Sequence, residues 1–255
     1  MCDFVSVTEV SGEKVSAEQI ERIKNRYCWA KKYCCDKDVL EVACGSGQGL
    51  GLIGSCANTL TAGDHSPAVL QTAMDHYKDR VPLEVFDAQN IPFGGNKFDV
   101  IVIFEAIYYL PDFVRFLHEC KRVLRDKGKI LISMPNVTLA DFNKSPYSHQ
   151  YFNIDELKDA LDVNNFDSEF FGYLDVKNIS IRQKLFRPIK KLAVNLGLIP
   201  KTMAGKQLLK RIVFGGLVEM PSELFIEDCE NCDHVDLLTG SESSHKVIYC
   251  VATLK

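Results

Sequence analysis

The sequence lacks any run of eighteen or so apolar residues, the length that a helix needs to cross a bilayer. Its N-terminal segment, MCDFVSVTEVSGEKVS, has neither the basic start nor the apolar core of a secretory signal. An excess of positive charge is also missing, because 30 Lys and Arg residues stand against 34 Asp and Glu residues, a formal net charge of −4. These absences predict a cytoplasmic protein without a general attraction to nucleic acid.

Cysteine is not scarce, with ten residues, but its pattern does not indicate a metal site. The single Cys-x-x-Cys is Cys229 to Cys232, followed by His234, whereas a zinc site needs four ligands that usually come from two such pairs. Several other cysteines stand in apolar stretches as small hydrophobic residues, namely Cys44, Cys56, Cys120 and Cys250. We therefore expect reduced thiols, loop cysteines at 229 and 232, and no metal.

Apolar runs and helical periods alternate along the chain, a pattern typical of strand and helix units around a parallel sheet. Strands are expected over residues 39–44, 59–63, 83–86, 98–104, 129–134, 168–173 and 246–253. Helices are expected over residues 17–33, 47–57, 67–77, 113–124 and 155–161. The nearly continuous apolarity of residues 98–104 fits a strand that is covered on both faces. The predicted fold is therefore α/β, with a doubly wound, mostly parallel sheet of seven strands.

Charge is segregated along the chain. Residues 176–218 carry ten Lys and Arg and no acid, which leaves 20 basic against 34 acidic residues elsewhere. We expect a core over residues 1–175, a basic helical insertion or lid over 176–228, and the C-terminal end of the core over 229–255. The insertion either closes a pocket, or meets an anionic acceptor or the surface of an anionic membrane.

Residues 39–51, VLEVACGSGQGLG, form a strand that runs into a glycine-rich turn opening a helix. The segment does not match the dinucleotide-binding motif G-x-G-x-x-G, because Leu50 and Leu52 stand where a third glycine would be needed. No Gly-Lys-Ser/Thr comes after it, so a Walker loop is also excluded. The turn instead favours a small polar ligand held by backbone groups.

Acidic residues recur where the first three core strands end: Glu41, Asp64 and Asp87. Ligands of open parallel sheets bind outside the carboxyl ends of the strands, so these side chains are expected to line one crevice. A carboxylate after the second core strand suits two ribose hydroxyls, and one after the third suits an exocyclic amine. Taken alone, Asp64 could instead cap the next helix, and Asp87 could be a turn residue.

At these positions the sequence resembles the class I S-adenosylmethionine (SAM) dependent methyltransferases. Five family motifs have counterparts in order, at residues 41–47, 62–70 (ribose), 86–93 (adenine), 98–110 and 122–133. The resemblance implies SAM as cofactor and a cofactor site of Tyr27, Glu41, Ala43, Gly45, Gly47, Asp64, His65, Asp87, Ala88 and Phe104. In that site Asp64 binds the ribose, Asp87 and Ala88 contact the adenine, and Tyr27 caps the cofactor. The methionine moiety is surrounded by Glu41, Ala43, Gly45 and Gly47. Ala43 departs from the commoner glycine.

The segment after the strand at 98–104 narrows the choice of methyl acceptor. Residues 104–109 contain no Asn/Asp-Pro-Pro-aromatic motif, and no Pro-Cys nucleophile is found, so nucleic acid is disfavoured as substrate. Residues 145–157 resemble a segment of methyltransferases that modify sugars, lipids or secondary metabolites, with His149 on the family's histidine. His149 is a candidate general base; alternatively, it only attaches its loop to the following helix. The other candidate catalytic residues are Glu105 and Tyr108.

The predicted function is thus SAM-dependent methyl transfer to a hydroxyl of a small molecule. A saccharide-containing or other secondary metabolite is the first acceptor class, and a quinone or lipid acceptor at a membrane surface is the second. The alternative from another functional class is a protein with the methyltransferase fold that binds SAM but catalyses no reaction. A nicotinamide oxidoreductase is disfavoured by Leu50. The sequence leaves the oligomeric state open.

Overall fold

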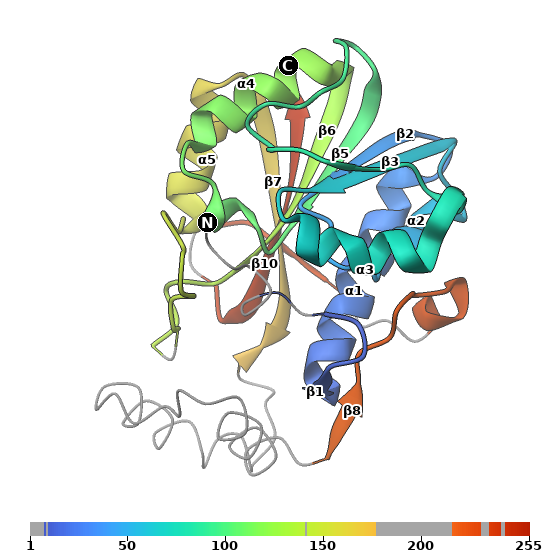
Figure 1. Ribbon diagram of the computed structural model, residues 1–255. Helices are drawn as coiled ribbons and strands as arrows, with labels where there is room; N and C mark the ends of the chain where they lie inside the picture. Colours follow the sequence, from blue (N-terminus) through green and yellow to red (C-terminus); the bar gives the residue numbers. More distant parts are fainter. Residues whose placement is uncertain (1–7, 9, 141, 177–215, 231–234, 241–242) are drawn as a thin grey trace.

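The computed structural model describes residues 8, 10–140, 142–176, 216–230, 235–240 and 243–255 (Figure 1). These described residues do not include positions 177–215, which hold all the basic residues of the predicted insertion, nor Cys232 and His234. Among the described residues, no helix has both the length and the apolar character needed to span a membrane.

One sheet of eight strands organises the described chain, in the order β4-β3-β2-β5-β6-β10-β7-β9 (Figure 1). Its strands are β2 (Asp38–Val42), β3 (Thr59–Asp64), β4 (Leu83–Val85), β5 (Phe98–Phe104), β6 (Leu124–Pro135), β7 (Phe166–Asp175), β9 (Asp236–Leu238) and β10 (His245–Leu254). The strands from β4 to β6 are parallel, β10 is antiparallel to both β6 and β7, and β9 is antiparallel to β7. The mostly parallel α/β class is confirmed.

The predicted count of seven strands was too low for this sheet. The additional strand is β9, which pairs three residues with the outer edge of β7. Its sequence, Asp-Leu-Leu, shows no alternation of apolar and polar residues. A separate pair, β1 (Lys14–Ser16) with β8 (Leu217–Glu219), joins the start of the described chain to the segment after residue 215.

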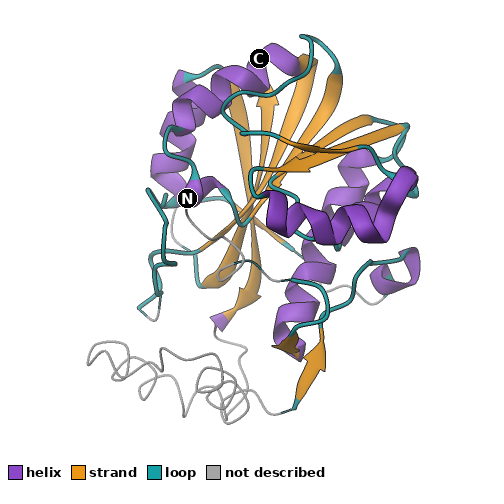
Figure 2. Cartoon of the chain, in the orientation of Figure 1, coloured by secondary structure: helices purple, strands orange, loops and turns teal. Residues whose placement is uncertain are grey.

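Helices cover both faces of the sheet (Figure 2). One face packs against α1 (Ala17–Cys34), α2 (Leu50–Gly54) and α3 (Pro67–Tyr77), and the other against α4 (Phe113–Val123) and α5 (Ile154–Val163). Short 3-10 turns lie at η2 (Lys78–Arg80), η3 (Ile107–Tyr109) and η5 (Ile226–Cys229). Each face buries its own apolar core, which explains why the strand at 98–104 is apolar on both sides.

Side chains at the helix starts explain most of the helix boundaries. Ser16 and Gln19 form a capping box at the start of α1, and Asn153 and Glu156 form one at the start of α5. Helix α2 is shorter than the predicted 47–57, because the glycine-rich stretch before Leu50 forms a turn and Gly49 offers no side chain as a cap.

The expectation of reduced thiols was wrong for one pair. Cys28 in α1 and Cys229 at the end of η5 form a disulfide, with their Cα atoms 5.4 Å apart. The two residues are 201 positions apart in the chain, and only the packing of η5 on α1 brings them together. The other six cysteines among the described residues are free.

Candidate functional site

A cavity of about 920 Å³ opens at the carboxyl ends of the parallel strands. Its volume lies in the range of small-molecule sites. Eleven of the thirteen predicted site residues line it: Tyr27, Ala43, Gly45, Asp64, His65, Asp87, Ala88, Phe104, Glu105, Tyr108 and His149. Glu41 and Gly47 are not among the lining residues. Residues far apart in sequence thus meet because successive parallel strands end on the same edge.

The glycine-rich turn is built so that no side chain fits inside it. Gly45 and Gly47 have positive φ angles of 61° and 80°, which glycine adopts readily. A Cβ atom on Gly49 would lie only 2.0 Å from the ring of Tyr27. The Tyr77 hydroxyl, 2.8 Å from the Gly47 carbonyl oxygen, donates to it and accepts from the Gly51 amide at 3.1 Å. Sequence reasoning missed Tyr77, which lies at the C-terminal end of α3.

Asp64 both organises the backbone and lines the cavity. Its Oδ2 accepts from the Gly45 amide at 2.9 Å, and its Oδ1 accepts from the Ser66 amide at 2.8 Å. Burial raises the pKa of this carboxyl group, against the lowering effect of the two amides. The cap of α3 is supplied by Ser66, whose Oγ accepts from the Val69 amide. Asp64 is therefore held rigidly at the end of β3, with acceptor capacity left on each oxygen.

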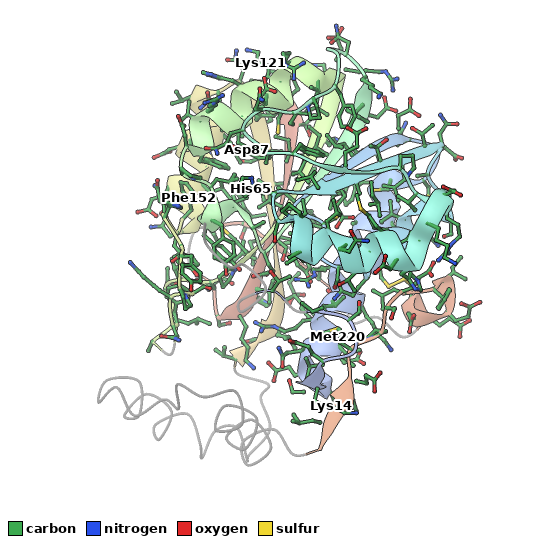
Figure 3. All side chains as sticks on the ribbon, in the orientation of Figure 1. Lys14, His65, Asp87, Lys121, Phe152 and Met220 are labelled. Atoms are coloured by element: carbon green, nitrogen blue, oxygen red, sulfur yellow. A yellow bond between two sulfur atoms is a disulfide. The ribbon has the colours of Figure 1, made fainter. Side chains whose placement is uncertain are left out.

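Asp87 also has two roles. Its Oδ1 accepts from the Gln89 backbone amide at 2.8 Å, a turn contact, while the residue lines the cavity. Gln89, which the sequence analysis did not single out, in turn accepts from the Asp112 amide through Oε1 at 2.7 Å. Figure 3 shows His65 and Asp87 at the same edge of the sheet, where β3 and β4 end. The hydrogen bond from the Gln89 amide agrees with the alternative that Asp87 is a turn residue. Asp87 can also contact a ligand, because it lines the cavity.

Glu41 lies behind the cavity wall. The residue is 1% exposed, and the Tyr27 hydroxyl donates to its Oε1 at 2.5 Å. Its Oε2 is buried and has no hydrogen-bond partner among the described residues. Burial raises the pKa of Glu41 to about 7, although the Tyr27 hydrogen bond and Arg26 act in the opposite direction. Glu41 therefore influences the cavity through Tyr27, which does line it.

Glu105 lines the cavity directly after β5, in a left-handed conformation with φ of 51°. The Ser133 hydroxyl donates to its Oε1 at 2.9 Å, and the Tyr108 hydroxyl donates to its Oε2 at 3.2 Å. Burial, together with the Glu105 charge, raises the pKa of Tyr108 well above its usual range, so this phenol stays a donor. A non-glycine residue at positive φ with both oxygens held is typical of a functional position.

His149 lies at an exposed position on the rim of the cavity. Its backbone amide donates to the Tyr108 carbonyl oxygen at 2.8 Å, a contact that joins the loop to η3 and does not involve the imidazole. Tyr108 is further held by Tyr151, whose ring stacks on it at a centroid distance of 4.6 Å. The catalytic role of the His149 imidazole stays a prediction.

Two arginines of α1 complete the cavity lining, and neither was among the predicted site residues. Arg22 and Arg26 are separated by one helical turn, and both line the cavity. Tyr249 of β10 lies on the same wall. The signal that could have found the arginines is their i, i+4 spacing on a helix that also presents Tyr27.

Comparison with known proteins agrees with the geometry. Residues 40–132 match the model of the methyltransferase domain family. A probable S-adenosylmethionine-dependent methyltransferase of Mycobacterium tuberculosis is 37% identical over 135 residues, which make up 50% of this chain and 48% of the relative. A phthiotriol/phenolphthiotriol dimycocerosates methyltransferase of Mycobacterium leprae is 35% identical over 97 residues, 37% of this chain and 36% of the relative. At 48% to 54% coverage, the chain spans about half the length of the first curated relatives that it matches.

A solved structure shows the same fold along most of the chain. The crystal structure of a SAM-dependent methyltransferase from Thermotoga maritima superimposes with a TM-score of 0.60 and 15% identity, over 93% of this chain and 92% of that one. At 15% identity, this similarity is evidence for a shared fold alone. The domain matched over residues 40–132, the similar relatives and the cavity at the strand ends all agree with the resemblance to SAM-dependent methyltransferases found in the sequence.

Proposed function

We propose that this protein transfers a methyl group from SAM to a hydroxyl group of a small molecule. The observation that carries the proposal is the composition of one cavity. Asp64, Asp87 and the glycine-rich turn follow the neighbouring strands β3, β4 and β2, Glu105 and Tyr108 follow β5, and residues from all these segments line the same cavity. Groups that can bind a nucleoside and a carboxylate that can take up a proton thus line one cavity.

The residues present fit the cofactor. Asp64 and Asp87 offer carboxylate oxygens to ribose hydroxyls and to the adenine amine, and the turn at Gly45 offers backbone groups without side-chain obstruction. Arg22 and Arg26 supply positive charge suited to a carboxylate such as that of the methionine moiety. When bound, SAM supplies an electrophilic methyl group on a sulfonium. The chain itself must orient the acceptor, exclude water and take up one proton.

Replacing Asp64 with Ala should weaken SAM binding by about 2 kcal/mol, roughly 30-fold, because two charge-assisted hydrogen bonds to the ribose are lost. Isothermal titration calorimetry with SAM measures the change. Asp75→Ala on α3 is the matched control, since Asp75 is exposed and its side chain accepts from Gln71 on the same helix. Unchanged affinity in Asp64→Ala would contradict the ribose role.

Glu105 is the group we propose to accept the proton of the acceptor hydroxyl. Ser133 and Tyr108 hold its two oxygens, so the carboxylate is oriented before the acceptor arrives. Tyr108 cannot serve as base because its raised pKa keeps it protonated at neutral pH. His149, at the rim, is the second candidate for this role.

The wall around Glu105 favours an apolar acceptor. It is formed largely by Phe104, Tyr108, Tyr109, Leu110 and Val247. The Tyr109 hydroxyl is bonded to Ser145 Oγ at 2.5 Å, and the hydroxyls of Tyr108 and Ser133 are directed at Glu105. These hydroxyl groups are therefore engaged within the protein, and the described residues beside Glu105 offer the acceptor mainly aromatic and aliphatic surface.

A lipid or quinone acceptor is therefore better supported than the saccharide-containing metabolite placed first from the sequence. The name of the Mycobacterium leprae relative, a phthiotriol/phenolphthiotriol dimycocerosates methyltransferase, points the same way.

A labelling experiment tests the proposed function. The protein is first titrated with SAM in a thermal-shift assay and then incubated with methyl-labelled SAM and two acceptor sets, hydroxylated lipids or quinols in vesicles, and nucleotide-linked sugars. We expect stabilisation by SAM and label in the lipid or quinol set. Label in the sugar set would favour the other acceptor class. Binding of SAM without label in either set or in a metabolite extract would support the non-catalytic rival.

A further inference from the structure

A segment that the sequence motifs do not include packs directly on the glycine-rich turn. We name residues 220–229, between β8 and the end of η5, the brace. The Leu224 amide donates to the Gln48 carbonyl oxygen at 2.7 Å, and Gln48 lines the cavity. The Glu223 carboxylate covers Gly51 so closely that a Cβ atom there would lie 1.9 Å from Glu223 Oε1. The brace thus touches the turn and the first residues of α2 at two points.

Glu223 is the main polar anchor of the brace. Its carboxylate is nearly buried and accepts two hydrogen bonds from Arg80, at 2.9 Å to Oε1 and 2.8 Å to Oε2. His76 Nε2 lies 2.7 Å from Oε2. Both partners lie at the end of α3 and in η2, next to Tyr77, and the Arg80 guanidinium stands 4.8 Å from the centre of the Tyr77 ring. Since Tyr77 bonds to Gly47 and Gly51, Glu223 supports the turn both directly and through α3.

The two ends of the brace are held independently of Glu223. Met220 exchanges backbone hydrogen bonds with Gly12 and Glu13, each 2.9 Å long, and Figure 3 shows it beside the lower part of α1. At the other end, Cys229 is joined by the disulfide to Cys28, the residue after Tyr27. Removing the Glu223 charge should therefore loosen the middle of the brace without releasing its ends.

The turn needs support from outside. Two of its glycines have positive φ, and glycine-rich backbone has many alternative conformations when no side chain restrains it. A ligand that binds such a turn must order it first, unless the protein has already done so. A brace that holds Gln48 and Gly51 in place removes this cost before the ligand arrives.

We propose that Glu223 is a positioning residue for cofactor binding, acting through Gln48 and Gly51 to keep the glycine-rich turn in its binding conformation. This inference rests on the proposed function, because it assumes that the turn binds SAM. It assigns a binding role to a residue outside every motif of the family resemblance.

The test compares Glu223→Gln with Glu219→Gln, a matched control four residues before Glu223. Glu219 is exposed and pairs at 3.4 Å only with Lys14 among the described residues. Two quantities are measured: the Kd for S-adenosylhomocysteine by calorimetry, and amide hydrogen exchange of residues 45–51 in the ligand-free protein. We expect Glu223→Gln to raise the Kd about tenfold and to speed exchange in the turn, and the control to do neither.

The possible outcomes separate the two proposals. Lower thermal stability in Glu223→Gln with unchanged Kd and unchanged exchange would show a merely structural residue and overturn the inference. A wild-type protein that does not bind the ligand would overturn the proposed function, while the exchange data still decide whether Glu223 orders the turn. If Glu223→Gln does not fold, Arg80→Gln removes the same ion pair from its half-exposed side and must give the same two effects.

Discussion

Glu105→Gln is expected to lower kcat for methyl transfer by at least about 100-fold, the usual contribution of a positioned general base. The amide keeps the shape of the side chain and can still accept from Ser133 or Tyr108, but it cannot take up the proton of the acceptor hydroxyl. Affinity for SAM should change little, because Glu105 follows β5 and is not one of the residues that we propose to bind the ribose or the adenine. Single-turnover label transfer to the acceptor found in the vesicle assay measures the rate.

His149→Gln distinguishes Glu105 from the other candidate base. His149 lies exposed at the rim, and the contact that holds its loop comes from its backbone amide, which the substitution retains. We therefore expect a loss of less than about tenfold in this variant. A large loss in His149→Gln together with a small loss in Glu105→Gln would transfer the role to the imidazole.

The second large effect is a dependence of stability on pH caused by Glu41. Burial raises its pKa to about 7 in the folded protein, against about 4.3 for an unperturbed Glu. The folded state therefore binds this proton more tightly than the unfolded state does. The stabilisation is complete below about pH 4.3 and is lost as the pH rises through about 7. The free energy of unfolding of the ligand-free protein should fall by about 3 kcal/mol across this window because of Glu41 alone.

Urea unfolding of the wild type and of Glu41→Gln, at several pH values from 5 to 8, isolates this contribution. The amide oxygen can still accept from the Tyr27 hydroxyl but carries no titratable proton, so other groups cancel in the difference between the two proteins. The variant should gain stability relative to the wild type as the pH rises. Parallel curves for the two proteins would mean that Glu41 does not titrate in this range.

Much of the fold could be predicted because the deciding signals are local. The strand at 98–104 and the helix that begins at Ala17 show their apolar period and their capping residues within a few positions. The carboxylates at 64 and 87 could be placed in one crevice because parallel strands end on one edge, a property of the topology.

Other predictions failed or were incomplete where packing decided the outcome. The alternation of residues in β2 does not show that Glu41 would point behind Tyr27 and away from the cavity. The thiols of Cys28 and Cys229 look like ordinary cysteines until η5 is seen to pack on α1.

By itself, the amino-acid order determined the α/β class, the glycine-rich turn and the set of residues at the strand ends, since each depends on neighbours along the chain. The tertiary structure alone decided that Glu223 covers Gly51, that Arg22 and Arg26 face the cavity, and that Ser133 and Tyr108 hold Glu105. These contacts join segments from separate parts of the chain, or depend on the direction in which a side chain leaves its helix or strand. The spacing of residues in the sequence shows neither these contacts nor these side-chain directions, because both result from how the helices and the sheet pack against each other.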